Sequence, residues 1–177
     1  HADGSPYWGL SDEAIIWRAI ARLLQDKNIK KIGQNLAFEW IYFWNHHIYS
    51  QGLFIDTMLL HHCLYSDFSG KVKTDTSSGR DIRTSRASEP GHGLAFIHSQ
   101  YNDDIYYKDD GRAWNPTLGD HQFWLYNCDD VINTYSVAMK MMTEAQNDKL
   151  WEFYVDKYVN KFLHTIEMEW QGVAIDI

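Results

Sequence analysis

The sequence predicts an α/β domain in which helices dominate and the sheet is small. Short apolar segments of strand length are each followed by a helical pattern, and longer amphipathic patterns occupy both ends of the chain. The 177 residues, 45% of them hydrophobic and 15% aromatic, suffice for one domain without a disulfide or a structural metal. We therefore expect one globular unit with an aromatic-rich interior.

The N-terminal elements follow from apolar spacing and capping residues. Ser11 precedes two acidic residues and a series of Ile, Ala and Leu at helical spacing, which predicts a helix over about 12–26 with Ser11 as its N-cap. Residues 29–32 alternate like a short strand, and Gly33 separates them from a second helix that extends towards Ile48. The expected local order is helix, strand, turn, helix.

A second strand and helix come next. Residues 53–55 predict the strand, and Asp56 is well placed to cap a helix that runs to Leu64. Residues 66–93 lose all periodicity and are rich in Ser, Thr, Gly, Asp and Arg, which predicts a long surface loop with a function or mobility of its own. Residues 94–99 fit either a helix or a strand.

The C-terminal third is predicted to be helical. One helix spans about 120–145 and another starts near Lys149, and Gly172 ends the latter. The sequence contains no internal repeat.

The formal net charge of −8 at first disfavours nucleic-acid binding, because phosphate contacts need Lys and Arg. Basic residues nevertheless gather in the predicted loop, as Lys71, Lys73, Arg80, Arg83 and Arg86. A locally basic loop on an acidic body is compatible with a metal-dependent nuclease, and a merely solvated loop is the alternative.

Two cysteines, Cys63 and Cys128, form no C-x-x-C motif and no disulfide framework, which indicates a reduced, intracellular and thus cytoplasmic setting. The apolar runs are far shorter than the roughly 20 residues that cross a bilayer. We therefore expect a soluble protein with no membrane partner.

Two polar pairs at i, i+4 spacing are candidates for chemistry: Asn35 with Glu39, and Tyr126 with Asp130. This spacing places each pair on one helix face. Asp130 shares its face with apolar residues, where a carboxylate is costly unless it is protonated or bound to a metal. Spacing by itself favours the alternative that both pairs lie on solvated faces.

Two pairs of adjacent histidines, His46 with His47 and His61 with His62, do not predict a metal site. Neighbouring residues of a helix point about 100° apart, so neither pair easily chelates one ion. We expect ordinary polar or packing histidines.

Longer strings around the two polar pairs resemble a known family. Residues 31–39 (KIGQNLAFE) resemble the second exonuclease motif of family A DNA polymerases, and residues 126–131 (YNCDDV) resemble the third. Residues 56–60 (DTMLL) and 167–176 (EMEWQGVAID) resemble segments at matching places in the same family. The chain is thus similar, over nearly its whole length, to the proofreading 3′-5′ exonuclease domain of a phage-type family A polymerase.

The resemblance implies a ribonuclease H-like exonuclease fold over residues 1–146, with 147–177 as a connecting helix and the start of a polymerase domain. It also implies two Mg²⁺ or Mn²⁺ ions that serve hydrolysis of the terminal nucleotide at a single-stranded DNA 3′ end. If the protein is encoded by a phage, as the resemblance implies, it would act inside a bacterial host.

The resemblance assigns roles residue by residue. Asp130 and Glu39 would bind the metal ions, Tyr126 would orient the attacking water, and Asn35 would brace the site and contact nucleic acid. The basic residues of the loop, Lys71, Lys73, Arg80, Arg83 and Arg86, are the other candidates for contact with DNA.

The sequence departs from the family pattern in two ways. Glu39 stands where the family usually has Asp, and the first motif, an Asp-x-Glu on an early strand, has no counterpart before Lys31. We therefore expect an N-terminally truncated fold that is mostly helical with a small residual sheet. We also expect little or no activity from the isolated chain.

Two alternatives remain beside this interpretation. One is a noncatalytic nucleic-acid-binding or assembly module that keeps the exonuclease fold, and the other is a stand-alone ribonuclease. In the truncated fold, the missing first strand would leave the strand at 29–32 without a neighbour. The open edge predicts a homo-oligomer, either a homodimer or a strand exchange, formed through that edge.

Overall fold

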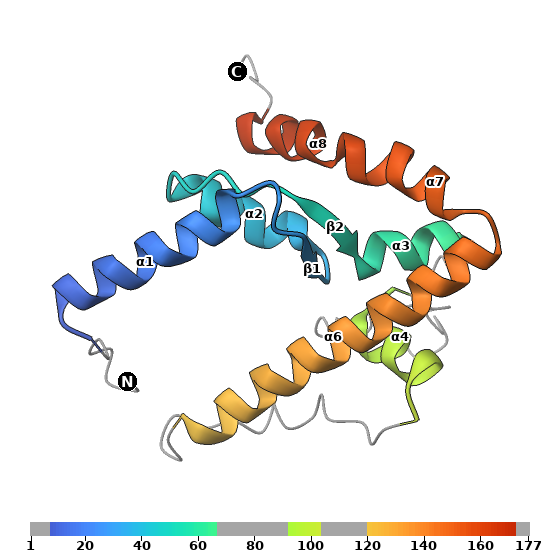
Figure 1. Cartoon of the computed structure of the whole chain (residues 1–177), viewed down its shortest axis with the longest axis horizontal. Coiled ribbons are helices and arrows are strands. Elements are labelled where there is room, and N and C mark those ends of the chain that lie inside the picture. Colours follow the sequence, from blue (N-terminus) through green and yellow to red (C-terminus); the bar gives the residue numbers. More distant parts are fainter. Residues whose placement is uncertain (1–7, 67–91, 104–119, 173–177) are drawn as a thin grey trace, which may run out of the picture.

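The computed structural model describes residues 8–66, 92–103 and 120–172, and its elements are drawn in Figure 1. In chain order they are α1 (Leu10–Gln25), β1 (Lys31–Gly33), α2 (Leu36–Asn45), β2 (Leu53–Asp56), α3 (Thr57–Leu64), α4 (Leu94–Tyr101), α6 (His121–Asn147), α7 (Trp151–Tyr154), a π-helical segment η3 (Val155–Val159) and α8 (Asn160–Gln171).

The two strands of the described sheet run parallel, with Ile32 opposite Ile55 and Gly33 opposite Asp56. Helix α2 connects them, so β1, α2 and β2 form a β-α-β unit. Both strands therefore end at the same edge of the sheet, where the turn into α2 and the start of α3 meet. The predicted α/β class, with dominant helices and a small sheet, is confirmed.

Gly52 makes the turn into β2 possible. Its φ of +78° is rarely adopted by other residues, and a Cβ atom there would lie 2.6 Å from the carbonyl oxygen of Ile29. The backbone of Lys31 donates a hydrogen bond of 2.8 Å to the Gly52 carbonyl. A close approach of two backbones thus brings β1 and β2 into register.

Two apolar clusters hold the helices to the sheet. The larger consists of buried residues from β2, α3, α4, α6 and α7: Ile55, Leu60, Ile97, Val137, Ala138, Met141, Ala145 and Tyr154. The smaller joins α2 to α8 through Trp40, Trp44, Phe162 and Ile166, with the Trp40 and Phe162 rings edge to face at 4.9 Å. Figure 1 shows the strands between α6 on one side and α7 with α8 on the other.

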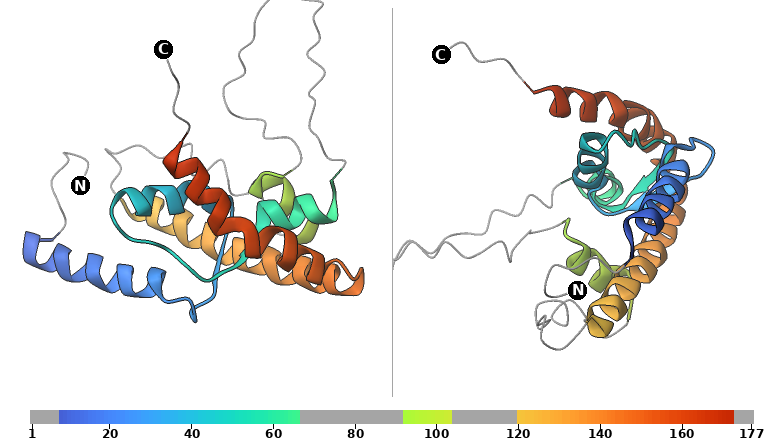
Figure 2. Two further views of the ribbon diagram at one scale, coloured as in Figure 1. Left: turned by 90° about the horizontal axis from the view of Figure 1, so that it is seen from above. Right: turned by 90° about the vertical axis from the view of Figure 1, so that its left-hand side faces the viewer.

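Helix α1 is attached differently. None of its residues is buried, and Leu10, Ile15, Trp17 and Leu23 are exposed although the helix is amphipathic. Figure 2 shows α1 extending away from the strands and α3. The apolar face predicted from its sequence is therefore present but largely uncovered.

Most predicted elements are confirmed, with local differences. The N-cap of α1 is Gly9 rather than Ser11, because the helix starts two residues earlier, and the first strand is Lys31–Gly33 rather than 29–32. Residues 94–99 adopt the helical alternative within α4. The second strand, the cap at Asp56 and the end at Gly172 agree with the sequence.

The last predicted helix is divided in the structure. It begins at Trp151 instead of Lys149, whose φ is +59°, and the π-helical segment η3 interrupts it before α8. Almost all of the predicted loop at 66–93 lies outside the described residues. In the part of the chain that is described, no helix is both long and apolar enough to cross a membrane.

Candidate active site

The carboxylate of Asp56 organises the edge at which both strands end. It accepts hydrogen bonds from the backbone N–H groups of Asn35 (3.1 Å), Leu36 (2.7 Å), Met58 (2.9 Å) and Leu59 (3.3 Å). One buried side chain therefore caps the N-termini of both α2 and α3. Burial raises the pKa of Asp56, and the four N–H donors oppose that shift by favouring the charged form.

The turn before α2 takes its shape from Asn35. Its backbone is left-handed, with φ of 55°, a conformation that Asn tolerates better than most residues. The turn places Leu36 at the start of α2 and Glu39 one turn later, on the side of the helix that faces α6. The sequence Gly-Gln-Asn-Leu thus converts the end of β1 into a helix that carries an acid.

An open cavity of about 400 Å³ lies beyond the end of β1. Its lining comes from β1 and the following turn, α2, α4 and α6: Ile32, Gly33, Gln34, Glu39, Leu94, Asp130, Val131, Thr134 and Tyr135. The two predicted metal-binding acids, Glu39 and Asp130, therefore line one cavity although they belong to different motifs. Ligands of open α/β sheets bind at this edge, outside the carboxyl ends of the strands.

The environment of Glu39 favours its protonated form. Burial raises the pKa of Glu39, and the negative charge of Asp56 raises it further, whereas a backbone hydrogen bond at Glu39 lowers it. A cation in the cavity would act in the opposite direction and stabilise the ionised carboxylate.

The other predicted site residues are placed as follows. Tyr126 is half-buried and lies one turn before Asp130 on α6, but it is not among the residues that line the cavity of Glu39 and Asp130. Asn35 is exposed and borders a second cavity instead. The predicted DNA-contacting residues Lys71, Lys73, Arg80, Arg83 and Arg86 lie outside the described residues.

Gln34 lines the cavity, although no role was predicted for it from the sequence. Its side-chain N–H donates to the carbonyl oxygen of His92 (2.8 Å), and its side-chain oxygen accepts from the hydroxyl of Thr57. It therefore ties the β1–α2 turn both to the start of α3 and to the segment before α4. The available sequence signal was its position in the Gly-Gln-Asn string between a strand and a helix.

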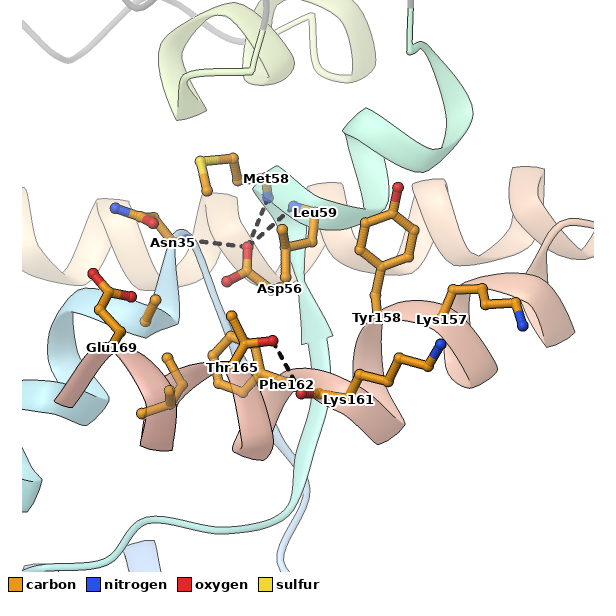
Figure 3. Close-up of a pocket in the computed structure, with 12 residues that line it drawn as sticks. Asn35, Asp56, Met58, Leu59, Lys157, Tyr158, Lys161, Phe162, Thr165 and Glu169 are labelled. Atoms are coloured by element: carbon orange, nitrogen blue, oxygen red, sulfur yellow. Dashed lines mark hydrogen bonds between the residues drawn. The ribbon is translucent and has the colours of Figure 1, made fainter. Parts of the chain in front are cut away.

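A second cavity, of about 230 Å³, lies on the opposite side of α2 and is shown in Figure 3. Met58, Leu59 and Phe162 form apolar parts of its lining, and Lys157 and Lys161 border it from η3 and α8. Asp56 lies between the two cavities and lines only the second. The acids Glu39 and Asp130 are thus separated from Lys157 and Lys161 by the capped helix ends.

The ligand chemistry of the first cavity suits hard cations only in part. Carboxylate oxygens are the preferred protein ligands of Mg²⁺ and Mn²⁺, and Glu39 and Asp130 supply them. Among the described residues, however, no group of three or more His, Cys, Asp or Glu side chains is arranged to hold a metal ion. The donor type fits, and the number of donors is short of a complete site.

Comparison with known proteins assigns the family. Residues 8–146 match the family model described as 3′-5′ exonuclease, which is well over half of the chain. The chain belongs to the 3′-5′ exonuclease family. The comparisons with curated proteins and with solved structures gave no match.

Family membership confirms the resemblance to a 3′-5′ exonuclease domain and the fold class predicted from it. The small parallel sheet and dominant helices of this exonuclease domain are consistent with a ribonuclease H-like fold. Exonuclease domains of this family are generally dependent on divalent metal ions and act on nucleic acid. The roles of Glu39, Asp130, Tyr126 and Asn35 remain predictions.

Proposed function

We propose that this domain is part of the proofreading unit of a phage-type family A DNA polymerase, in which it hydrolyses phosphodiester bonds at single-stranded DNA 3′ ends with the help of Mg²⁺ or Mn²⁺. One observation carries the proposal. Glu39 and Asp130, the acids of the two matching motifs, line the same cavity beyond the end of β1. Carboxylates brought together in one cavity suit a two-metal hydrolase, whose ions activate water and stabilise the leaving oxygen.

The chain's own residues would have distinct tasks. Asp130 and Glu39 would hold the cations, Tyr126 would orient the attacking water, and Asn35 would brace the turn next to the terminal nucleotide. The basic segment with Lys71, Lys73, Arg80, Arg83 and Arg86 would contact the phosphates of the strand. The cations would supply a nucleophilic water and neutralise charge on the leaving oxygen.

Two carboxylates are too few for two such ions. Mg²⁺ demands near-octahedral oxygen coordination, and water would have to fill most of the positions around it. An Asp-x-Glu strand ahead of His1 in the parent protein would add the missing oxygens. In the described sheet β1 pairs only with β2, so its second edge is free to accept such a strand.

The same reasoning gives this chain little or no exonuclease activity in isolation. A displacement of a catalytic group by about 1 Å can reduce a rate on the order of 100-fold, and here ligands of the metal ions would be absent altogether.

Residues 147–177 would form the connection to the polymerase domain, and the free cysteines Cys63 and Cys128 suit an intracellular protein.

The test compares two purified proteins. The chain of 177 residues and a version preceded by the Asp-x-Glu strand are each incubated with single-stranded and 3′-recessed DNA in Mg²⁺ or Mn²⁺. We expect cleavage from the 3′ end only by the longer protein, because only that protein holds both ions. Comparable rates from the two proteins would contradict the account of the missing ligands.

Variants of the longer protein then locate the site. Asp130→Ala is expected to reduce the rate roughly 100-fold or more, since it removes a preorganised ligand. Asp129→Ala is the matched control, because Asp129 is the preceding residue of α6 and is exposed. Equal losses in the two variants would exclude Asp130 as a specific ligand.

The shortage of donors in the described residues favours a second candidate, a noncatalytic nucleic-acid-binding module. This candidate predicts DNA binding without cleavage by both proteins, and no effect of Asp130→Ala on that binding. Cleavage by the longer protein would exclude it.

A further inference from the structure

A buried histidine pair joins the two segments on either side of residues 67–91. His61 of α3 is fully buried, and its Nδ1 atom lies 2.7 Å from Nδ1 of His92, which precedes α4. The Nε2 atom of His61 lies 2.8 Å from the side-chain oxygen of Gln100 on α4. His61 therefore contacts both the start and the end of the α4 region.

These contacts fix the protons of the pair. The side-chain oxygen of Gln100 only accepts, so Nε2 of His61 carries a proton and Nδ1 of neutral His61 is bare. The short Nδ1 to Nδ1 distance then requires a proton on Nδ1 of His92, which donates it to His61. His61 is thus the Nε2–H tautomer and His92 the Nδ1–H tautomer, each selected by its partner.

The histidine pair is connected through His92 to the cavity lined by Glu39 and Asp130, here called the exonuclease cavity. The carbonyl oxygen of His92 accepts the hydrogen bond from Gln34, and Leu94 follows two residues later at the start of α4. Gln34 and Leu94 both line the cavity that contains Glu39 and Asp130. Two parts of the cavity wall therefore depend on where the backbone of His92 is held.

We propose that His61 and His92 are positioning residues of the exonuclease cavity. The hydrogen bond between their Nδ1 atoms fixes the position of the His92 backbone, and thereby the positions of Gln34 and Leu94 in the cavity lining. This lining would contact the terminal nucleotide. The contact between this lining and DNA rests on the proposed function. The hydrogen bond between His61 and His92, and its effect on Gln34 and Leu94, do not. Neither residue touches the reacting atoms.

Charge on the pair limits its protonation. A first added proton can go to Nε2 of His92, which leaves the Nδ1–H to Nδ1 contact intact. A second would have to go to Nδ1 of His61, which places N–H against N–H and breaks the contact. Burial lowers the pKa of both His61 and His92, and each is lowered further by a neighbouring histidine. Among the described residues, the titratable groups facing His61 include His92, His62 and Tyr65, together with Glu144 of α6, which raises the pKa of His61.

The first experiment reads the tautomers directly. Long-range ¹H–¹⁵N spectra of the ¹⁵N-labelled chain at neutral to mildly alkaline pH are expected to show His61 as Nε2–H and His92 as Nδ1–H. The exposed His164 of α8 serves as the internal comparison. Exchange-averaged tautomers at both His61 and His92 would overturn the pairing.

Substitutions then test the connection to the cavity. His61→Asn places an acceptor oxygen near the position of Nδ1 and is expected to leave the side-chain amide signals of Gln34 and the backbone amide of Leu94 almost unchanged. His61→Leu removes the acceptor and is expected to shift both. His92→Leu, at a half-buried position that tolerates change better, is expected to shift the same signals, and the double variant to shift them no further.

Binding of a short single-stranded DNA to the chain completes the test. His61→Leu is expected to weaken it roughly tenfold, the cost of one buried hydrogen bond, while His61→Asn and the control His164→Asn remain within about twofold of the wild type. Equal effects of His61→Asn and His61→Leu on the Gln34 and Leu94 signals would overturn the positioning role. Absence of DNA binding by the wild type would contradict the proposed function alone, because the spectra still decide the pair.

Discussion

The two halves of α6 have opposite environments. In its C-terminal half, Val137, Ala138, Met141 and Ala145 are completely buried against α3, α4 and α7. In its N-terminal half, Leu125, Val131 and Ile132 are apolar and yet more than half exposed. One continuous helix thus leaves the core part of the way along its length.

The difference separates a packed part of the domain from an open part. The packed part comprises β2, α3, α4, the C-terminal half of α6 and α7, and the open part comprises α1, the outer edge of β1 and the N-terminal half of α6. The cavity with Glu39 and Asp130 lies at the junction, since its lining includes both Leu94 of the packed part and Val131 of the open part. Stability should therefore depend on the packed part, and assembly and chemistry on the open part.

The largest effect on stability is expected at Asp56. Asp56→Ala removes the cap from two helices and leaves four backbone N–H groups without their acceptor, at a cost of about 4 kcal/mol. Urea denaturation measures this change in the free energy of unfolding. The exposed Asp148 offers a control, since Asp148→Ala should cost less than about 0.5 kcal/mol.

Two substitutions in α6 test whether its two halves contribute differently to stability. Met141→Ala is expected to lower the free energy of unfolding by about 3 kcal/mol, because it opens a cavity in the core, whereas Ile132→Ala should change it by less than about 0.5 kcal/mol. Equilibrium denaturation of both variants provides the measurement. Similar losses at the two positions would show that the open half of α6 is packed in solution.

Sequence reasoning succeeded at several positions where a local signal decides the structure, although it misplaced the cap of α1 at Ser11. Asp56 before a helical pattern, the Gly-Gln-Asn turn and the terminal Gly172 each act through their own backbone neighbours, so capping and turn rules were enough. The shared cavity of Glu39 and Asp130 could be anticipated only because two motifs resembled one family. Spacing on each helix says nothing about the distance between helices.

What the sequence did not reveal depends on contacts between distant segments. His61 was expected to be an ordinary packing histidine, and it is buried, but its bond to His92 requires α3 and the start of α4 to meet in space. The hydrogen bonds that Asp56 accepts from the backbone N–H groups at the start of α2 depend in the same way on β1 and β2 ending side by side. The π-helical segment η3 carried no sequence signal that we can identify.

The open part is expected to support self-association through a second copy of the chain. An unpaired strand edge beside exposed apolar side chains favours pairing, so we predict a homodimer at micromolar concentration that buries β1 and the adjacent face of α6. The variant Ile132→Lys should weaken the dimer by about tenfold, equivalent to about 1.4 kcal/mol. Analytical ultracentrifugation gives the dissociation constant.

The matched control for association is Met168→Lys. Met168 is an exposed apolar residue of α8, in a region away from the open half of α6, so its substitution should leave the dimer unchanged. A wild-type protein that is monomeric in light scattering at micromolar concentration would contradict the prediction.

The smallest expected effect concerns Glu39. Its pKa is raised, mainly by burial and also by the charge of Asp56, so the folded state holds the Glu39 proton more tightly than the unfolded state does. The stability that this proton provides is fully present below the ordinary pKa of 4.5 and is lost as the pH rises through the raised value. Above that window, ionised Glu39 weakens the fold.

Glu39→Gln is therefore expected to stabilise the chain slightly at neutral pH and to have almost no effect in acid. Because Glu39 is partly exposed and solvent screens its charge, the gain should be only a few tenths of a kcal/mol. Urea midpoints on both sides of the window measure it, with Glu152→Gln on the exposed side of α7 as the control. The same measurement is repeated with Mn²⁺. A metal ion that binds only the folded state raises its stability, so Mn²⁺ should stabilise the wild type more than Glu39→Gln if Glu39 is a ligand. The difference in unfolding free energy between the two proteins would then become smaller or change sign. An unchanged difference in Mn²⁺ would exclude Glu39 as a metal ligand of the isolated chain.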